Sequence, residues 1–201
     1  MAIVGRPREF DRGAALEAAM LAFWRKGFAA TSMNDLCDAM GVRSPSLYAA
    51  FGGKEALYLE AVEHYVLTVG LPIWGRLAEG ATARAGVESL LLTATETLPK
   101  CGTIPAGCMA TLAAISDEWP EGIAEAVRKI RVDMRGVLRS RLDAGVADGE
   151  LAPTTDIEGL SRFYLSVYQG MAVQTRDGAG TAELSGLVVA AMAAWPADGR
   201  G

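Results

Sequence analysis

The chain has 201 residues, of which 51% are hydrophobic, and a formal net charge of −5. A chain of this length can bury a sizeable core in one or two domains, and its acidic balance argues against a protein that coats nucleic acid along its whole surface. No apolar run approaches the roughly 18 residues of a membrane span, and the first residues lack the apolar stretch of a secretory signal, so we expect a cytoplasmic protein.

Sites for catalysis, metals and cofactors find little support in the sequence. Three cysteines do not make a disulfide framework, and a single histidine argues against His-rich metal sites and His-based triads. Glycine-rich phosphate-binding loops are absent. The acidic pairs Asp117-Glu118 and Asp148/Glu150 fall at expected helix ends, where carboxylates act as caps or solvated charges. We therefore expect no catalytic residues, no metal and no cofactor.

The first segment, residues 1–10, is expected to form an arm. Pro7 keeps it extended, and the guanidinium groups of Arg6 and Arg8 can reach phosphates or a minor groove. A solvated tail is the alternative. A first helix is expected from about Asp11 to Lys26, ended by Gly27, with Trp24 in the core.

A second and a third short helix are predicted between residues 32 and 51. Ser32 and Asp35 form the pattern of a capping box, and Gly41 is placed as a left-handed residue at the end of the first of these helices. An apolar stripe follows from the positions i, i+3, i+4 and i+7: Met33, Leu36, Cys37 and Met40. We expect Cys37 to lie in the core of this region.

The helix after the turn has a polar face. Ser44 is expected to cap it, with Pro45 at its first position, while Leu47, Ala50 and Phe51 face inward. Arg43, Ser44, Ser46, Tyr48 and Ala49 are left outward. This pattern matches a helix-turn-helix: two helices are joined by a glycine turn, and the second presents short polar side chains. A major groove about 12 Å wide admits one such helix, so the second helix can reach the base edges.

The stretch GFAATSMNDLCDAMGVRSPSLYAAFGGKEALY resembles the DNA-binding segment of the tetracycline-repressor (TetR) family of bacterial transcription regulators. The resemblance is strong over residues 5–65. It is carried by these positions: Gly27, Phe28, Thr31, Leu36, Gly41, Val42, Leu47, Tyr48, Phe51, Lys54 and Leu57. Position and resemblance together predict DNA contacts from Arg6, Arg8, Thr31, Ser32, Arg43, Ser44, Ser46, Tyr48 and Lys54.

The fold class is expected to be all-α. A fourth helix should run from near Gly53 to Val69, with Lys54 placed in its first turn to grip a phosphate. Gly70-Leu71-Pro72 is the expected break, giving a three-helix helix-turn-helix DNA-binding domain at 1–65 and a helical effector-binding and dimerisation domain at 66–201. Further helices are expected at about 83–98, 105–118, 121–147, 155–176 and 181–195.

The last two of these helices are apolar over much of their surfaces, so a partner surface is expected to cover them. The resemblance implies that they pair with their copies in a homodimer. Close approach there would use the small residues Gly170, Gly186, Ala190, Ala191 and Ala194. The basic residues of the 121–147 helix fit a solvated face better than a second DNA contact.

The resemblance also implies a small-molecule effector bound inside the second domain. Residues available to line that site are Trp74, Met109, Trp119, Met134, Tyr164 and Tyr168. Plain core packing is the alternative for each, because pockets and cores share composition. Few charged residues are expected inside, which favours an apolar or aromatic effector.

The sequence therefore predicts a ligand-responsive, sequence-specific DNA-binding transcription regulator, not an enzyme, and most simply a repressor that the effector releases from DNA. Its dimer would read a pseudo-palindromic double-stranded DNA operator, with no membrane partner. One alternative of the same fold is a thiol-based sensor that uses Cys101 and Cys108. Two functions of a different class stay open beside it: a small helical enzyme, and an architectural DNA protein without sequence preference.

Overall fold

The computed structural model describes residues 11–99, 101–113 and 119–196, and these residues are helical apart from turns and one isolated bridge between Cys101 and Ile104. The chain divides into two compact units, Met1–His64 and Tyr65–Gly201. The described part contains no strand beyond that bridge, so the predicted all-α class is confirmed. None of its helices has the length and apolar character needed to cross a membrane.

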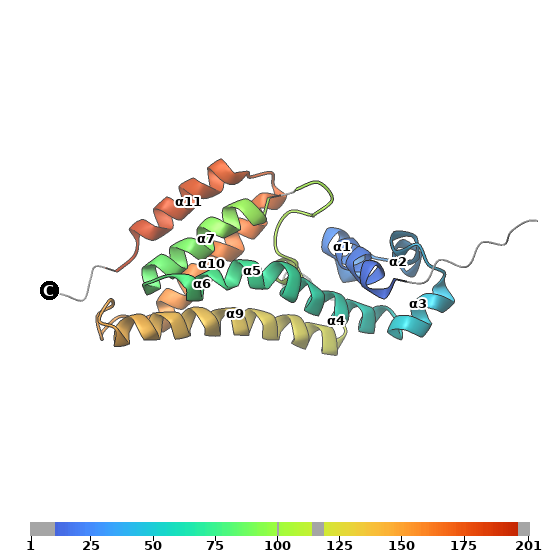
Figure 1. The fold of residues 1–201 in the computed structure, drawn as a ribbon, viewed down its shortest axis with the longest axis horizontal. Helices are drawn as coiled ribbons and strands as arrows, with labels where there is room; N and C mark the ends of the chain where they lie inside the picture. Colours follow the sequence, from blue (N-terminus) through green and yellow to red (C-terminus); the bar gives the residue numbers. More distant parts are fainter. Residues whose placement is uncertain (1–10, 100, 114–118, 197–201) are drawn as a thin grey trace, which may run out of the picture. The chain divides into compact units, whose positions relative to one another are not determined.

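Unit 1 contains α1 (Arg12–Ala30), α2 (Met33–Met40), α3 (Ser44–Phe51) and most of α4 (Lys54–Tyr65) (Figure 1). Within α1 the dihedral angles of Gly27 leave the helical region (φ 78°, ψ 169°), as the predicted helix end requires. Three aromatic rings form the centre of the core. The Tyr58 ring meets Phe23 and Phe28 edge-on, with centroids 4.9 Å and 5.3 Å apart. Trp24 is also buried, as expected.

The expected break at Gly70-Leu71-Pro72 is wrong. After α4 the chain continues as a π-helical turn, η1 (Val66–Gly70), and then as α5 (Leu71–Trp74) and α6 (Arg76–Glu79). Proline interrupts an α-helix because it lacks an N–H and its ring clashes with the carbonyl four residues earlier. Here the turn widens ahead of the proline, so that the Leu71 N–H donates to the Val66 carbonyl, and the backbone stays helical.

Unit 2 is built around α7 (Ala83–Thr97), which packs against α6, α9 (Glu121–Ala147), α10 (Ile157–Arg176) and α11 (Thr181–Ala193) (Figure 1). The predicted ends of the four long helices, α7, α9, α10 and α11, are confirmed to within two residues. The helix expected at 105–118 is wrong at its start, because α8 begins only at Met109 and covers Met109–Leu112. The positive φ of Gly107, 86°, prevents an earlier start. Residues 114–118 lie outside the described residues.

The start of α7 is held by a carboxylate 67 residues further along the chain. Glu150 accepts hydrogen bonds from the N–H groups of Ala83 (2.6 Å) and Arg84 (2.8 Å). Nearby, the Arg141 guanidinium donates to the carbonyl of Gly80 at 2.8 Å. A carboxylate at a helix N-terminus satisfies exposed N–H groups and suits the helix dipole. Glu150 therefore caps a helix, as expected, but that helix is α7, which begins 67 residues earlier in the chain.

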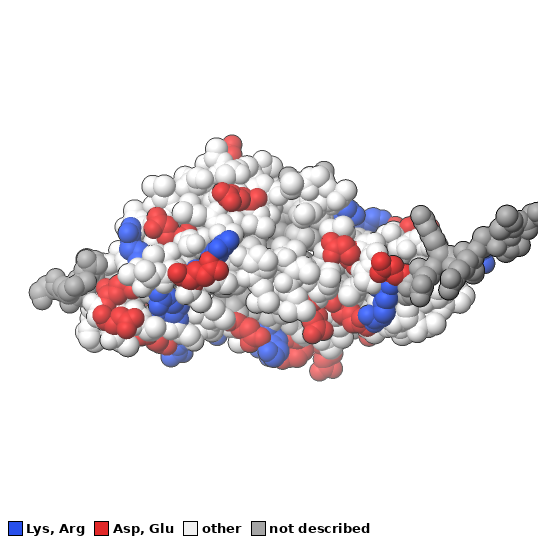
Figure 2. Space-filling view, viewed as in Figure 1, with Lys and Arg blue, Asp and Glu red and all other residues white. Residues whose placement is uncertain are grey.

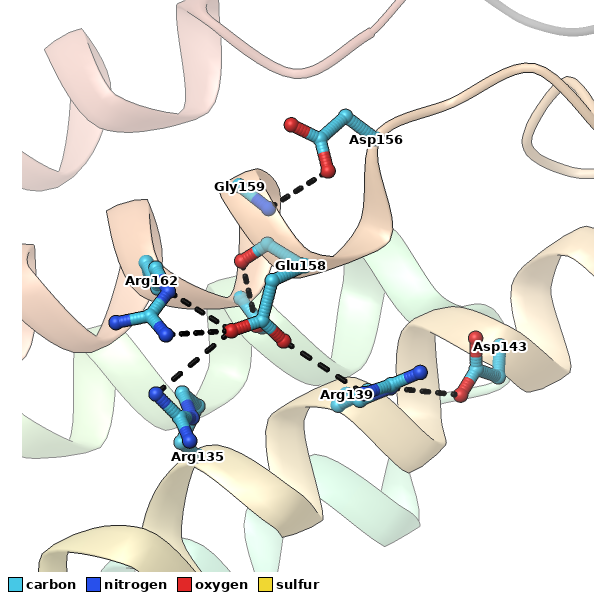
Figure 3. A network of polar contacts seen from close by, with 8 residues as sticks. Arg135, Arg139, Asp143, Asp156, Glu158, Gly159 and Arg162 are labelled. Carbon is cyan, nitrogen blue, oxygen red and sulfur yellow. Dashed lines mark hydrogen bonds and ion pairs between the residues drawn. The ribbon is translucent and has the colours of Figure 1, made fainter.

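Four basic residues of α9 are paired with acidic neighbours: Arg128, Lys129, Arg135 and Arg139. Basic and acidic side chains intermix on the face shown in Figure 2. At the centre of one network, Glu158 of α10 accepts from Arg162 at 2.8 Å and lies 3.7 Å from both Arg135 and Arg139 of α9 (Figure 3). Exposed pairs of this kind add little stability, but they consume the positive charge. The interpretation of a solvated face fits this arrangement better than a second DNA contact.

The close packing of α6 on α7 gives the first testable prediction. A Cβ atom added at Gly86 would lie 2.4 Å from the backbone oxygen of Leu77, which cannot move freely. Gly86→Ala should therefore destabilise the protein by about 1–3 kcal/mol, as overpacking does. In Gly136→Ala, the matched control on α9, the added methyl meets nothing within 4 Å, and stability should be unchanged or rise. Thermal unfolding measures both; equal melting temperatures for the two variants would contradict the packing.

Candidate functional site

The N-terminus of α2 is fixed by the predicted capping box. The Asp35 N–H donates to the Ser32 hydroxyl oxygen at 3.1 Å, and the Ser32 N–H donates to the Asp35 carboxylate at 2.8 Å. The Lys26 ammonium adds a contact of 2.6 Å to the same carboxylate. The hydrogen bond from Lys26, followed by those from Ser32, holds the pKa of Asp35 well below its ordinary value. The start of α2 is therefore tied both to its own backbone and to α1.

The C-terminus of α2 turns at Gly41, which adopts the left-handed conformation (φ 66°, ψ 31°). The Gly41 N–H donates to the Asp38 carbonyl (3.3 Å), and the Val42 N–H donates to the Cys37 carbonyl (3.0 Å). These two bonds form a Schellman motif, which stops the helix and sends the chain into α3. Any side chain at position 41 would be strained in this conformation.

The apolar stripe of α2 is narrower than expected. Leu36 is fully buried, whereas Met33, Cys37 and Met40 are half-buried. The expectation that Cys37 lies in the core is corrected accordingly. An eight-residue helix with one buried face packs mainly through its central leucine, and the positions at its ends remain near solvent.

The helix after the turn, α3, begins one residue earlier than predicted. Arg43, not Ser44, occupies the N-cap position, and its carbonyl accepts from the N–H groups of Ser46 (2.9 Å) and Leu47 (3.1 Å). The assignment of Ser44 as the cap is therefore wrong, because its backbone is already helical. Ser44 lies in the exposed first turn beside Pro45.

The two faces of α3 differ sharply. Leu47 and Phe51 are buried, while the outward side chains are exposed: Arg43, Ser44, Ser46, Tyr48 and Ala49. Tyr48 is 52% exposed, and its ring lies over Gly53, where an added Cβ would come within 3.7 Å of it. The glycine thus makes room for the ring and leaves the tyrosine at the surface.

Arg12 braces the end of α3, a role that sequence reasoning missed. Its guanidinium donates to the Ala50 carbonyl (3.4 Å) and the Glu60 carboxylate (2.6 Å), and it stands 4.4 Å from the centroid of the Phe51 ring. The signal available in the sequence was weak, since an arginine in the first turn of a helix is unremarkable in itself. This arginine links α1, α3 and α4.

Three of the predicted DNA-contact residues have other contacts within unit 1. Thr31 is fully buried, and its hydroxyl donates to the Gly27 carbonyl at 2.6 Å, so the structure gives it a role inside the unit and not at a DNA surface. The Lys54 ammonium lies 4.3 Å from the Phe28 ring centroid, and partial burial lowers its pKa. Ser32 is exposed, but its hydroxyl already serves the capping box. Arg6 and Arg8 lie outside the described residues.

The residues predicted to line an effector site fall into separate places. Trp74 of α5 and Tyr168 of α10 meet edge-on, with ring centroids 5.1 Å apart. Tyr65, which sequence reasoning missed, lies near both Tyr168 and the backbone of Met109. Burial raises the pKa of Tyr65 well above its ordinary value.

Tyr164 lies apart from this pair, against Phe163 and Trp195, and its hydroxyl donates to the Ala191 carbonyl at 3.3 Å. Burial raises its pKa to about 12. Met134 is buried on α9 and Trp119 is half-buried ahead of it. The structure therefore brings together Trp74, Tyr168 and Met109 of the predicted set, and it leaves Tyr164 in the contact between α10 and α11.

The three cysteines differ in access. Cys101 is exposed, Cys37 is half-buried, and Cys108 is fully buried at the N-cap position of α8. Of the two cysteines named for the thiol-based alternative, only Cys101 is therefore accessible to solvent.

Both units match a known family of proteins. The sequence profile of "Bacterial regulatory proteins, tetR family" matches residues 15–61, and that of "Tetracyclin repressor-like, C-terminal domain" matches residues 88–182. The chain is 32% identical over 200 residues to the HTH-type transcriptional repressor ComR of Escherichia coli (strain K12), covering 96% of this chain and 92% of that protein. The chain belongs to the TetR family.

Two further relatives are informative. The chain is 36% identical over 107 residues to the HTH-type transcriptional repressor BdcR of Escherichia coli (strain K12), covering 53% of this chain and 54% of that protein. The TetR family transcriptional regulator CifR, solved as a cysteine-substituted variant with 26-bp double-strand operator DNA, superposes with a TM-score of 0.89 at 39% identity, covering 96% of this chain and 100% of that one. The protein is a DNA-binding transcription regulator of this family, and the relatives named above are regulators and not enzymes.

The low pKa of Asp35 gives a prediction about pH. Because the folded state holds this pKa below its ordinary value of 3.8, the carboxylate stabilises the fold above that pH, and this contribution is lost as the pH falls further. Asp35→Asn should therefore lower the melting temperature at pH 7, and the difference from the parent should shrink below about pH 4. Circular dichroism at several pH values measures this. Asp38→Asn, the same change on α2 outside the box, should show no such convergence; a constant deficit for Asp35→Asn would exclude the assigned role.

Proposed function

We propose that this TetR-family protein is a repressor that binds a pseudo-palindromic operator as a homodimer and leaves it when a small effector binds in unit 2. The observation that carries the proposal is the division of α3 into a buried face, Leu47 and Phe51, and an exposed face of short polar groups. A helix held rigidly on one side can present the other to base edges in a major groove. ComR and BdcR, both described as repressors, support the direction of control.

We assign the DNA contacts by exposure and chemistry. Arg43, Ser44 and Ser46 stand at the first turn of α3, which in a helix-turn-helix meets base edges. Tyr48, farther along the same face, suits a phosphate oxygen. Lys54 is assigned to a second phosphate oxygen, because the contact of its ammonium with the Phe28 ring fixes where that ammonium lies.

The dimer surface is assigned to α10 and α11. On α10, Phe163 and Val173 are exposed at 41% and 39%, and Val189 of α11 is exposed at 72%. A Cβ added at Gly170 or Gly186 would meet nothing within 4 Å of its own chain, so these glycines leave room for another backbone. Ala190 and Ala194 are also exposed, but Ala191 is buried within its own protomer and leaves the proposed surface.

The effector acts by population shift. A ligand that binds one arrangement of the dimer more tightly than the other changes the free energy of operator binding by that difference, about 1–3 kcal/mol in typical allosteric proteins.

We assign DNA binding to residues 1–65, and effector binding and dimerisation to residues 66–201. The thiol-based alternative needs accessible thiols, and of its two cysteines only Cys101 is exposed.

The DNA-contact assignment is tested with Arg43→Ala. If Arg43 makes a bidentate contact to a base, its loss should cost about 1–3 kcal/mol at the cognate operator and little at a non-specific duplex, so the ratio of the two affinities falls. Arg128→Ala removes the same charge from the exposed Arg128–Glu125 pair on α9 and should leave the ratio unchanged. Fluorescence anisotropy measures both affinities. An unchanged ratio for Arg43→Ala would remove the base contact.

The dimer assignment is tested with Val189→Asp. A charge at the centre of an apolar interface is costly, so the variant should sediment as a monomer and bind the operator far more weakly, because the two half-sites no longer act together. Ala182→Asp introduces the same charge at an exposed position in the first turn of α11, where the helix dipole tolerates it, and this control should remain dimeric. A dimeric Val189→Asp variant would show that the interface lies elsewhere.

A further inference from the structure

The exposed face of α3 lacks two kinds of side chain that read bases. In a major groove, asparagine or glutamine reads adenine and a carboxylate reads cytosine. The described residues of α3, with Arg43 ahead of them at the N-cap, include none of these. Arg43 suits a guanine, while the hydroxyl groups of Ser44 and Ser46 do not select one base. An A·T pair therefore needs another kind of contact from this helix.

Two exposed positions on α3 are apolar. Pro45 and Ala49 are both exposed and lie one helical turn apart, at i and i+4, so they share one strip of the helix surface. In the major groove an apolar side chain contacts the 5-methyl group of thymine, which distinguishes thymine from the other three bases. This strip therefore provides the contact to A·T pairs that the polar side chains of α3 lack.

The residues around Ala49 leave its methyl group open to a base. The helix ends at Gly52, whose φ is 78°, and neither Gly52 nor the following Gly53 has a side chain. The neighbouring large side chain, Tyr48, has its ring beside Gly53, where an added Cβ would come within 3.7 Å of it. Ala49 itself stays exposed, while Leu47 holds the helix on the core from the other face. The methyl group can therefore approach a base edge closely.

We propose that the methyl group of Ala49, with the ring of Pro45 one turn before it, contacts the 5-methyl group of a thymine in each half-site of the operator, so that Ala49 determines sequence specificity. This deepens the proposed function, on which it rests for the placement of α3 in the major groove. Six residues separate Ala49 from Arg43, which corresponds to about 9 Å along a helix. At about 3.4 Å per base pair, the thymine lies within about three base pairs of the guanine that Arg43 contacts.

The test deletes the methyl group of thymine and nothing else. The probe is a duplex that the protein enriches from a random pool, in which each thymine of the half-sites is replaced in turn by deoxyuridine, symmetrically in both. Uracil pairs with adenine as thymine does. At one thymine position the parent protein should bind the uracil duplex about fourfold more weakly per half-site, as expected for one methyl group lost from an apolar contact. Fluorescence anisotropy measures these affinities.

Ala49→Gly removes the same contact from the protein side. The variant should bind the thymine duplex about as weakly as the parent binds the uracil duplex, and it should no longer distinguish the two duplexes at that position. Ala39→Gly is the matched control, because it makes the same change at an exposed position of α2 with a similar loss of helix propensity. It should keep the parent's preference for thymine. The readout is a ratio of two affinities of one protein, so a lower stability of either variant does not produce the effect.

Two results would each overturn the proposal: the absence of any thymine position at which uracil weakens binding, and an Ala49→Gly variant that keeps the parent's preference. A failure of the proposed function would look different. In that case the random pool yields no enriched sequence, or Arg43→Ala keeps the parent's ratio of cognate to non-specific affinity, and the thymine contact falls with the placement of α3.

Discussion

We infer that DNA recognition by this protein depends on the orientation of α3 relative to α2. That orientation is set by the left-handed Gly41 and the two backbone hydrogen bonds of the Schellman motif around it. Leu36 and Leu47, both fully buried, hold the two helices on the same core. Because each helix is only eight residues long and would not be stable alone, these few interactions decide where the exposed side chains point.

Two charged residues of α1 stabilise this arrangement of α2 and α3. Lys26 contacts the capping carboxylate Asp35, and Arg12 joins Ala50 and Glu60 across three helices. The positive charges of Lys26 and Arg12 are therefore paired inside unit 1, and they do not add to a basic DNA-facing surface. Under our proposal that a few exposed groups of α3 recognise DNA, no broad basic surface is needed, and the acidic net charge of the chain is compatible with DNA binding.

The elements that sequence reasoning placed correctly are those with strong local signals. The 27-residue α9 has the predicted bounds, because its apolar period is sustained and Pro120 and Gly149 delimit it. Signals that depend on three-dimensional context misled the prediction. Pro72 looked like a break, but a π-helical turn accommodates it. Thr31 looked like a DNA contact, yet its hydroxyl turns inward to Gly27. The contact of Tyr168 with Trp74 joins residues 94 positions apart, and no local pattern encodes it.

The central claim, that α3 of a symmetric dimer reads DNA sequence, is tested most directly by selecting bound duplexes from a random pool with the purified protein. The account predicts enrichment of an inverted repeat whose half-sites are centred about one helical turn, roughly 34–36 Å, apart or a multiple of it. A pool that remains random after several rounds, while the protein retains DNA at low salt, would contradict it.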